Sequence, residues 1–298
     1  MLWAGAGRLG LAVSGGPDSM ALLVLAQAAR PGRIAAATVD HGLRAEAAAE
    51  AALVAAACSQ LDVPHTCLPV TVAQGNLQAE ARTARYAALA GWMRDCDLAA
   101  LATAHHADDQ AETLLLRLNR GAGVAGLAGV RARGTVPGSA RPLIRPLLAW
   151  RRAELAAVID HSGLGAVQDP SNFDSRFDRA RLRKALTTAD WIDQPALAAS
   201  AAHLADADLA LEWAAVREWN EHVSVIPLGL RYRPAAPRAI ALRVLARIVT
   251  QQTGDAPRGS ALARLFESLI ARQPMSIGNL VARATVDGWS FTKAPQRR

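Results

Sequence analysis

The stretch "SGGPDS", residues 14–19, stands between two apolar runs, "LGLAV" (9–13) and "MALLVLAQAA" (20–29). A strand that ends in Gly-Gly and leads directly into a helix directs backbone N–H groups, and the positive end of the helix dipole, toward an anion. The two serines add hydroxyl donors, and the proline suits a first helical turn, where its missing N–H has no bond to lose. A simple strand-to-helix turn needs fewer of these features, so we expect a phosphate-binding loop.

Apolar, β-favouring runs alternate with Ala- and Leu-rich stretches through the first half of the chain. Such alternation predicts an α/β fold, in which a parallel, Rossmann-like sheet carries helices on both faces. The Gly- and Pro-rich segment "ARGTVPGSA" (132–140) is expected to be a loop. The expected strands are 8–14, 33–40, 65–70, 97–104 and 141–148, and the expected helices are 18–29, 46–61, 77–94, 107–119 and 151–162.

From about residue 185 the pattern changes to amphipathic helical stretches. We therefore expect a catalytic domain over 1–188 and a smaller, mostly helical domain over 189–298. The final segment "LVARATVDGWSFTKAP" (280–295) is expected to form a short β-hairpin.

The charge balance is basic, with 33 Lys and Arg against 26 Asp and Glu. Eleven of the cationic residues and six of the acidic ones lie between 131 and 190, where they can hold a nucleic acid backbone or form a solvated basic surface. The three cysteines form no CxxC pair, so neither a disulfide framework nor a Cys-rich metal site is indicated. No apolar run approaches the roughly 18 residues that span a bilayer, and no basic leader is present. We expect a cytoplasmic protein without a membrane segment, and no protein partner is evident.

Two further polar clusters follow expected strands. "VDHGLR" (39–44) ends the second strand, where a carboxylate can orient or deprotonate an amine, although a polar turn explains this spacing equally well. "TAHHADDQAET" (103–113) is denser, and its Asp109 and Glu112 share one helix face if the helix starts near residue 107. Carboxylates there suit Mg²⁺. Acidic residues also stabilise a helix N-terminus, but that does not account for the paired histidines.

Two common nucleotide-binding patterns are excluded. The chain has no GxxxxGK[ST] loop, and no lysine lies near residues 14–19. The segment "GAGVAG" (121–126) matches GxGxxG, but it follows an expected helix rather than a strand, so we interpret it as a Gly-rich turn.

The loop resembles the pyrophosphate-binding loop of the N-type ATP pyrophosphatases, which cleave ATP between the α and β phosphates. The motifs together resemble one family of that superfamily, the tRNA(Ile)-lysidine synthases. The resemblance extends through "EARTARYAAL" (80–89), "ATAHHADDQAETLLLRLNRGAGVAGL" (102–127), "RPLL" (145–148) and "QDPSNFDSRFDRARLR" (168–183). It implies adenylation of the wobble cytidine of an isoleucine tRNA with a CAU anticodon, followed by attack of free L-lysine.

The resemblance also implies roles for particular residues. Asp40 would be the base or the orienting group for the lysine amine, and His105 and Asp109 would support adenylation. Mg²⁺ would lie at Asp109 and Glu112. The residues implied for ATP binding are Ser14, Gly15, Gly16, Pro17, Asp18 and Ser19, and those implied for RNA binding are Arg179, Arg181 and Arg183.

Two alternatives stay open at this point. A tRNA thiolase of the same superfamily shares the "HHADD…ET" pattern, but such enzymes usually need paired cysteines, and Cys58, Cys67 and Cys96 lie outside the motifs. A nucleotide- or RNA-binding module without catalysis is the second alternative. The presence of each acidic and histidine position of the motifs speaks against it.

Overall fold

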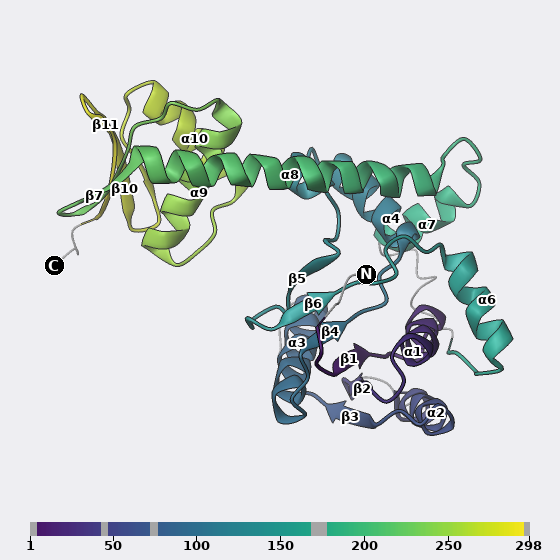
Figure 1. Ribbon diagram of the computed structural model, residues 1–298. Coiled ribbons are helices and arrows are strands. Elements are labelled where there is room, and N and C mark those ends of the chain that lie inside the picture. Colours follow the sequence, from purple (N-terminus) through teal and green to yellow (C-terminus); the bar gives the residue numbers. More distant parts are fainter. Residues whose placement is uncertain (1–4, 43–46, 72–76, 168–177, 295–298) are drawn as a thin grey trace. The chain divides into compact units, whose positions relative to one another are not determined.

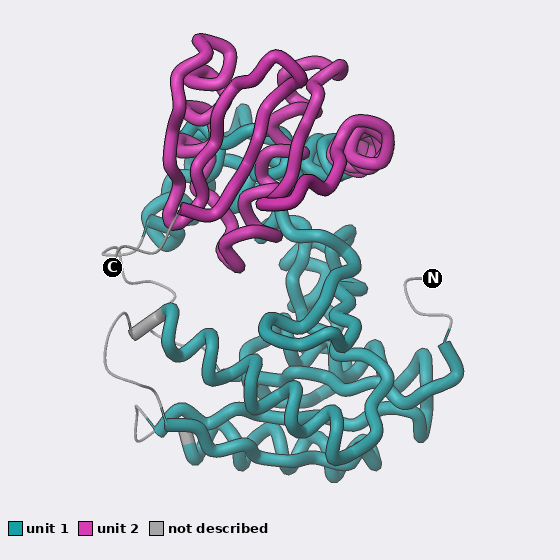
Figure 2. The backbone as a smooth tube through the Cα atoms, turned by 90° about the vertical axis from the view of Figure 1, so that its left-hand side faces the viewer, with its two compact units in different colours: residues 1–205 teal, residues 206–298 magenta. Residues whose placement is uncertain are grey.

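The computed structural model describes residues 5–42, 47–71, 77–167 and 178–294 (Figure 1). The chain forms two compact units, one up to Ala205 and one from Asp206 onward (Figure 2). The division falls inside a single helix, α8 (Gln194–His222), on the C-terminal side of the expected domain boundary. None of the described helices is both long enough and apolar enough to cross a membrane.

The first unit is built on a six-stranded sheet with the order β3-β2-β1-β4-β6-β5. β1 lies between β2 and β4 and pairs with both in parallel, so the expected α/β fold is confirmed. The strands are β1 (Leu9–Ala12), β2 (Ile34–Asp40), β3 (His65–Pro69), β4 (Ala100–Ala102), β5 (Arg133–Thr135) and β6 (Pro142–Ile144). The helices are α1 (Pro17–Ala29), α2 (Ala47–Gln60), α3 (Leu77–Asp95), α4 (Ala107–Leu118), α5 (Val124–Leu127), α6 (Arg152–Ser162) and α7 (Asp178–Leu186).

Side chains alternate across this sheet, so β1, β2, β4 and β6 each contribute to two hydrophobic cores. Leu11 packs with α1, α2 and α6 on one face, whereas Ala35 packs with α3 on the other. Figure 1 shows α3 on one side of the sheet and α1 and α2 on the opposite side. Gly10 lets α3 approach β1 closely, because a Cβ at this position would lie 2.7 Å from Cζ3 of Trp92.

One strand of this sheet differs from expectation. β5 lies within the segment that was expected to be a loop, and it pairs with β6 in antiparallel orientation. Its three residues are exposed, so they lack the apolar pattern by which strands are recognised. The "GAGVAG" segment lies between the end of α4 and α5 rather than after a strand, in agreement with its interpretation as a turn.

The second unit combines the C-terminal part of α8 with α9 (Arg238–Thr253), α10 (Gly259–Ile270) and a five-stranded antiparallel sheet. The expected hairpin is present as β10 and β11, with Leu280 opposite Lys293. Three further strands, which are short, were not expected; β7 and β9 contain no buried residue, and β8 alternates between buried and partly exposed ones. The strands are β7 (Val223–Ile226), β8 (Gly229–Tyr232), β9 (Met275–Ile277), β10 (Leu280–Thr285) and β11 (Gly288–Lys293), in the order β7-β8-β11-β10-β9.

A buried carboxylate joins α8 to β8 in this unit. Glu218 accepts a hydrogen bond from the Tyr232 hydroxyl at 2.9 Å, and two more from the backbone N–H groups of Ala235 and Ala236. Burial opposes ionisation of Glu218, but these donors outweigh it and lower the pKa of the carboxyl group. Glu218 is therefore a structural anion that positions the β8 end against the helix.

Candidate functional site

Three polar clusters lie at one edge of the first sheet. β1, β2 and β4 are parallel, and their C-terminal ends lead into "SGGPDS", "DHG" and "HHADD" respectively. From β1 the chain adds β2 and β3 on one side of the sheet, and it then returns to add β4 on the other side of β1. Open α/β sheets bind their ligands at the point where the strand order reverses in this way. The sheet topology therefore brings together clusters that are far apart in the sequence.

The loop after β1 is closed around one hydroxyl group. Oγ of Ser19 accepts a hydrogen bond from the Ser14 backbone N–H at 3.1 Å and donates one to the Gly16 carbonyl at 2.9 Å. Gly15 has a φ of 87°, a conformation that favours glycine, and α1 begins at Pro17 immediately behind the loop. A closed loop at a helix N-terminus is a geometry that binds phosphate.

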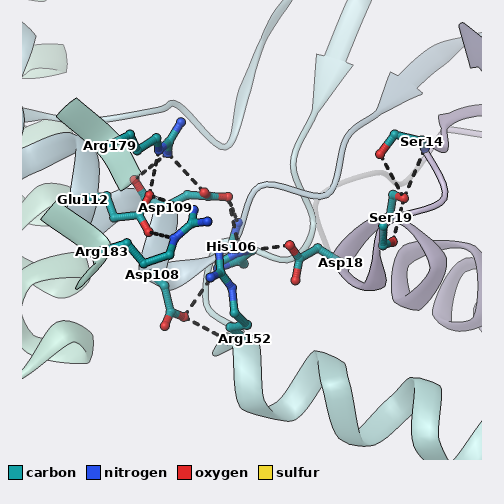
Figure 3. A network of polar contacts seen from close by, with 11 residues as sticks. Ser14, Asp18, Ser19, His106, Asp108, Asp109, Glu112, Arg152, Arg179 and Arg183 are labelled. Carbon is teal, nitrogen blue, oxygen red and sulfur yellow. Dashed lines mark hydrogen bonds and ion pairs between the residues drawn. The ribbon is translucent and has the colours of Figure 1, made fainter. Parts of the chain in front are cut away.

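The second histidine of "HHADD" lies among three carboxylates (Figure 3). Nε2 of His106 is 3.4 Å from Asp18 and 3.5 Å from Asp109, and Nδ1 is 3.4 Å from Asp108. Burial disfavours the charged imidazolium, but the contacts with Asp108 and Asp18 outweigh it and raise the pKa of His106 to about 9. His106 is therefore a buried cation at neutral pH that joins the start of α1 to the start of α4.

The sequence indicated His105 rather than His106 as the functional histidine. One signal for His106 was present, because a residue before a helix with an acid three positions later is typical of a capping box. The His106 backbone N–H does donate to Asp109 at 3.1 Å. Its neighbour Asp108 accepts from the Arg152 backbone N–H at 2.8 Å. Burial raises the pKa of Asp108, but His106 and this N–H outweigh it and lower the pKa to about 2.

His105 has the opposite environment. Its Nδ1 lies 3.0 Å from the Thr103 hydroxyl. Burial lowers its pKa to about 4; Asp109 opposes this effect, and nearby arginines reinforce it. His105 is therefore a neutral imidazole at physiological pH, able to form hydrogen bonds without carrying charge.

A buried glutamate organises two arginines from α7. Glu112, which is 2% exposed, accepts from Nε of Arg179 at 2.7 Å and from Nε of Arg183 at 2.9 Å. Arg179 also contacts Asp109 at 3.1 Å (Figure 3). Burial opposes the ionisation of Glu112, but the two guanidinium groups lower its pKa overall. These ion pairs hold α7 against α4.

The three arginines implied for RNA binding thus divide between two directions. Arg179 and Arg183 are four residues apart on the helix, so they share the face that meets α4. Arg181 lies on the other side of α7, where it pairs with Asp178 at 2.5 Å and its side chain is 62% exposed. Residues 168–177 of the same basic stretch lie outside the described residues.

Asp40 is the last residue of β2. Its Oδ1 accepts a hydrogen bond from the Gly42 backbone N–H at 2.8 Å, which fixes the carboxylate at the end of the strand. Burial and Arg85 lower the pKa of the neighbouring His41, and Asp40 opposes them. Arg44 of the "VDHGLR" motif lies outside the described residues.

Two carboxylates at this edge fit a magnesium ion. Oδ1 of Asp18 is buried and has no hydrogen-bond partner among the described residues, and Asp109 contacts the same histidine as Asp18. Mg²⁺ is usually held by one or two carboxylates together with water and substrate phosphates. Within the described ranges no group of three or more His, Cys, Asp or Glu is arranged as a metal site. Glu112, the other ligand that the sequence implied, has a 3% exposed side chain, and both its oxygens pair with arginines. Asp109 also pairs with Arg179, but its side chain is 16% exposed.

Comparison with known proteins adds a family assignment to this geometry. A family model described as the PP-loop domain matches residues 4–189. A tRNA(Ile)-lysidine synthase of Novosphingobium aromaticivorans is 48% identical over 98% of this chain and 90% of its own length. The tRNA(Ile)-lysidine synthase of Zymomonas mobilis is 40% identical over the same shares of the two chains.

A solved structure shares the fold. The U34-tRNA thiolase NcsA of Methanococcus maripaludis, solved with its [4Fe-4S] cluster, aligns with a TM-score of 0.51 and 16% identity. The match covers 66% of this chain and 70% of the thiolase. At this identity the likeness concerns the fold alone.

Proposed function

This chain belongs to the tRNA(Ile)-lysidine synthase family of PP-loop proteins, and from that premise we propose how its residues carry out the reaction. The enzyme ligates lysine to the wobble cytidine of an isoleucine tRNA that has a CAU anticodon. ATP is converted to AMP and diphosphate. The product, lysidine, changes codon reading from methionine to isoleucine.

In the first half-reaction the 2-carbonyl oxygen of the cytidine attacks the α-phosphorus of ATP, and the bond to the β-phosphate breaks to release diphosphate. We assign the phosphates to the loop of residues 14–19, whose backbone N–H groups and serine hydroxyls are suitable donors. Asp18 and Asp109 would hold Mg²⁺, which when bound neutralises phosphate charge. Neutral His105 would hydrogen-bond the nucleotide without adding to the positive charge that His106 already places beside Asp109.

In the second half-reaction the ε-amine of free lysine attacks C2 of the cytidine, and AMP leaves with the carbonyl oxygen. A free ammonium has a pKa near 10.4, so on the order of one molecule in a thousand is neutral at pH 7. A carboxylate beside the amine can hold the ammonium and accept its proton during attack. We assign this role to Asp40, because it ends a neighbouring parallel strand at the same edge.

The arginines of α7 take two different roles in this proposal. Arg181 is exposed and would contact RNA. Arg179 and Arg183 would act as positioning residues that keep Glu112 and Asp109 in place. If the two arginines moved away to contact RNA, the buried Glu112 carboxylate would lose its partners, which is unfavourable.

The observation that carries the proposal is the convergence of three clusters at one sheet edge, in a chain that is 48% identical to a lysidine synthase. Mass spectrometry of the isoleucine tRNA tests it after incubation with the protein, ATP, magnesium and L-lysine. We expect one cytidine to gain the mass of lysine minus water. An unchanged tRNA under these conditions would contradict the proposal. Such a reaction draws on cytoplasmic ATP and tRNA, so we place the protein in the cytoplasm.

The thiolase alternative is disfavoured by the cysteines. Cys58 is buried on α2, Cys67 is exposed on β3, and Cys96 follows α3. Burial raises the pKa of Cys58 to about 11, which makes its thiolate scarce at neutral pH. Incorporation of labelled lysine, rather than labelled sulfur, separates the two enzymes. Diphosphate release that depends on tRNA separates an enzyme from a binding module.

A further inference from the structure

A second group of arginines surrounds a buried tyrosine near the same sheet edge. Tyr86 of α3 is 1% exposed, and the guanidinium carbons of Arg82 and Arg85 each lie 5.0 Å from its ring centroid. Arg145 follows β6 and is 8% exposed. Burial lowers the pKa of Arg145, with Tyr86 opposing and Arg82 reinforcing this effect, so Arg145 lies near both of these side chains. Three positive charges therefore gather around one fixed aromatic ring.

These three arginines form no ion pair with a described carboxylate, in contrast to Arg179 and Arg183. Nη1 of Arg145 donates to the Arg131 carbonyl at 2.6 Å, but its Nε is buried and has no partner within the described ranges. The Tyr86 hydroxyl is also buried, and it lies close enough to Arg145 to raise the pKa of that guanidinium group. Clustered like charges repel, and no described carboxylate pairs with these arginines, so this site is complementary to an anion.

Two of the three arginines belong to α3, which covers the other face of the sheet from the helix behind the ATP loop. Arg85 is close enough to lower the pKa values of His41 and His105, which follow β2 and β4. α3 covers the sheet face opposite to α1, the helix behind the phosphate loop (Figure 1). A nucleophile and a leaving group lie roughly in line across a transferring phosphorus. An acceptor nucleotide therefore approaches from the side away from the diphosphate.

We propose that Arg82 and Arg85 bind backbone phosphates of the tRNA beside the reacting nucleotide, and that buried Arg145 adds positive charge behind them. Exposure decreases from Arg82 through Arg85 to Arg145, so Arg82 and Arg85 are the two accessible members of the cluster. Guanidinium groups bind phosphate oxygens in bidentate fashion. The fixed ring of Tyr86 restrains two of them before RNA binds, which reduces the entropy lost on binding. This inference rests on the proposed function, because it takes the tRNA as the substrate.

The test compares tRNA binding by the R82A/R85A double variant with the wild-type protein over a range of salt concentrations. In filter binding with the CAU isoleucine tRNA, removal of two phosphate contacts should reduce the slope of log K against log[salt] by about 1.4 and weaken binding at low salt at least tenfold. ATP binding should be unchanged. Arg94→Ala, near the end of the same helix, is the matched control, because Arg94 pairs with exposed Asp95 away from the cluster.

Three results would overturn the inference. These are an unchanged slope and affinity in the double variant, a raised KM for ATP with intact tRNA binding, and a raised KM for lysine alone. The last two would assign the cluster to the nucleotide or to the lysine carboxylate. Circular dichroism verifies that the variants are folded, and R82K/R85K should recover most of the slope by restoring charge. The binding assay needs no chemistry, so wild-type protein that binds tRNA but makes no lysidine would contradict the proposed function instead.

Discussion

Asp40 and Asp109 end up at one sheet edge on different elements, so the two half-reactions can be separated by mutation. We expect Asp40→Asn to form adenylated tRNA but to transfer lysine at least about 100-fold more slowly, because it loses a general base. Asp109→Asn should fail to adenylate, because it loses a charge beside the phosphates. Trapping the intermediate with ATP labelled in its α-phosphate measures both. If Asp40→Asn abolishes adenylation as completely as Asp109→Asn does, Asp40 belongs to the ATP site.

His106 makes the stability of the first unit depend on pH. Its pKa is about 9 in the folded protein and near 6.5 in an unfolded chain. A raised pKa means that the folded state holds the proton more tightly. The stabilisation is therefore complete below about pH 6.5 and is lost as the pH rises through about 9. We expect the Tm to fall across this range, and His106→Asn to flatten that part of the profile.

Thermal unfolding followed by circular dichroism between pH 6 and about pH 10 measures this effect. His203→Asn is the control, because His203 is exposed on α8 and should leave the pH dependence unchanged. A wild-type Tm that is constant over this range would contradict the assignment of a buried imidazolium.

At this scale the residue types of the site were predictable, but their pairings were not. The carboxylates and histidines lie at the expected strand ends, and the residue types of each cluster indicate its chemistry from the sequence alone. That Arg179 and Arg183 share a helix face follows from their spacing of four. Which face meets Glu112 depends on how α7 docks against α4, and no local pattern encodes that contact.

The elements of the first unit were predictable because most of them carry strong signals. Buried strands such as β2 read as apolar runs between turn residues, and the helices are long. β5 was missed because exposed residues form it, and β7 and β9 because they are short and have no buried residue to mark them. Pairing with longer neighbours, rather than local propensity, makes these segments strands.

Gly10 provides a test of the packing between β1 and α3. We expect Gly10→Ala to lower the free energy of unfolding by about 1–3 kcal/mol, because the added methyl group meets the buried ring of Trp92 and the side chain of Leu98. Gly134→Ala in β5 is the matched control, since a Cβ there meets nothing within 4 Å. Urea denaturation compares the two variants. Equal free energies of unfolding for the two variants would show that α3 can move away from β1 without destabilising the fold.

At the scale of the whole molecule, the second unit has a hydrophobic core of its own. The buried residues of this core run from Ala215 to Phe291 and include Tyr232 and Trp289, whose rings meet edge to face. A fragment over 194–298, which keeps α8 intact, should therefore fold alone. We expect a cooperative urea transition with a stability of about 5 kcal/mol or more, monitored by tryptophan fluorescence. A gradual, non-cooperative transition would show that the second unit depends on the first.

The ion pairs of Glu112 also bear on how the enzyme is made. Its two partners lie 67 and 71 residues further along the chain, so translation delivers the glutamate long before either guanidinium. A nascent polypeptide that already displays the phosphate loop still carries an uncompensated glutamate where α7 will dock. Ribosomal synthesis must proceed past Arg183 before the pocket can mature. The ion pairs of Glu112 can therefore form only after Arg183 has been synthesised, and a ribosome-bound chain that ends before this residue would be inactive.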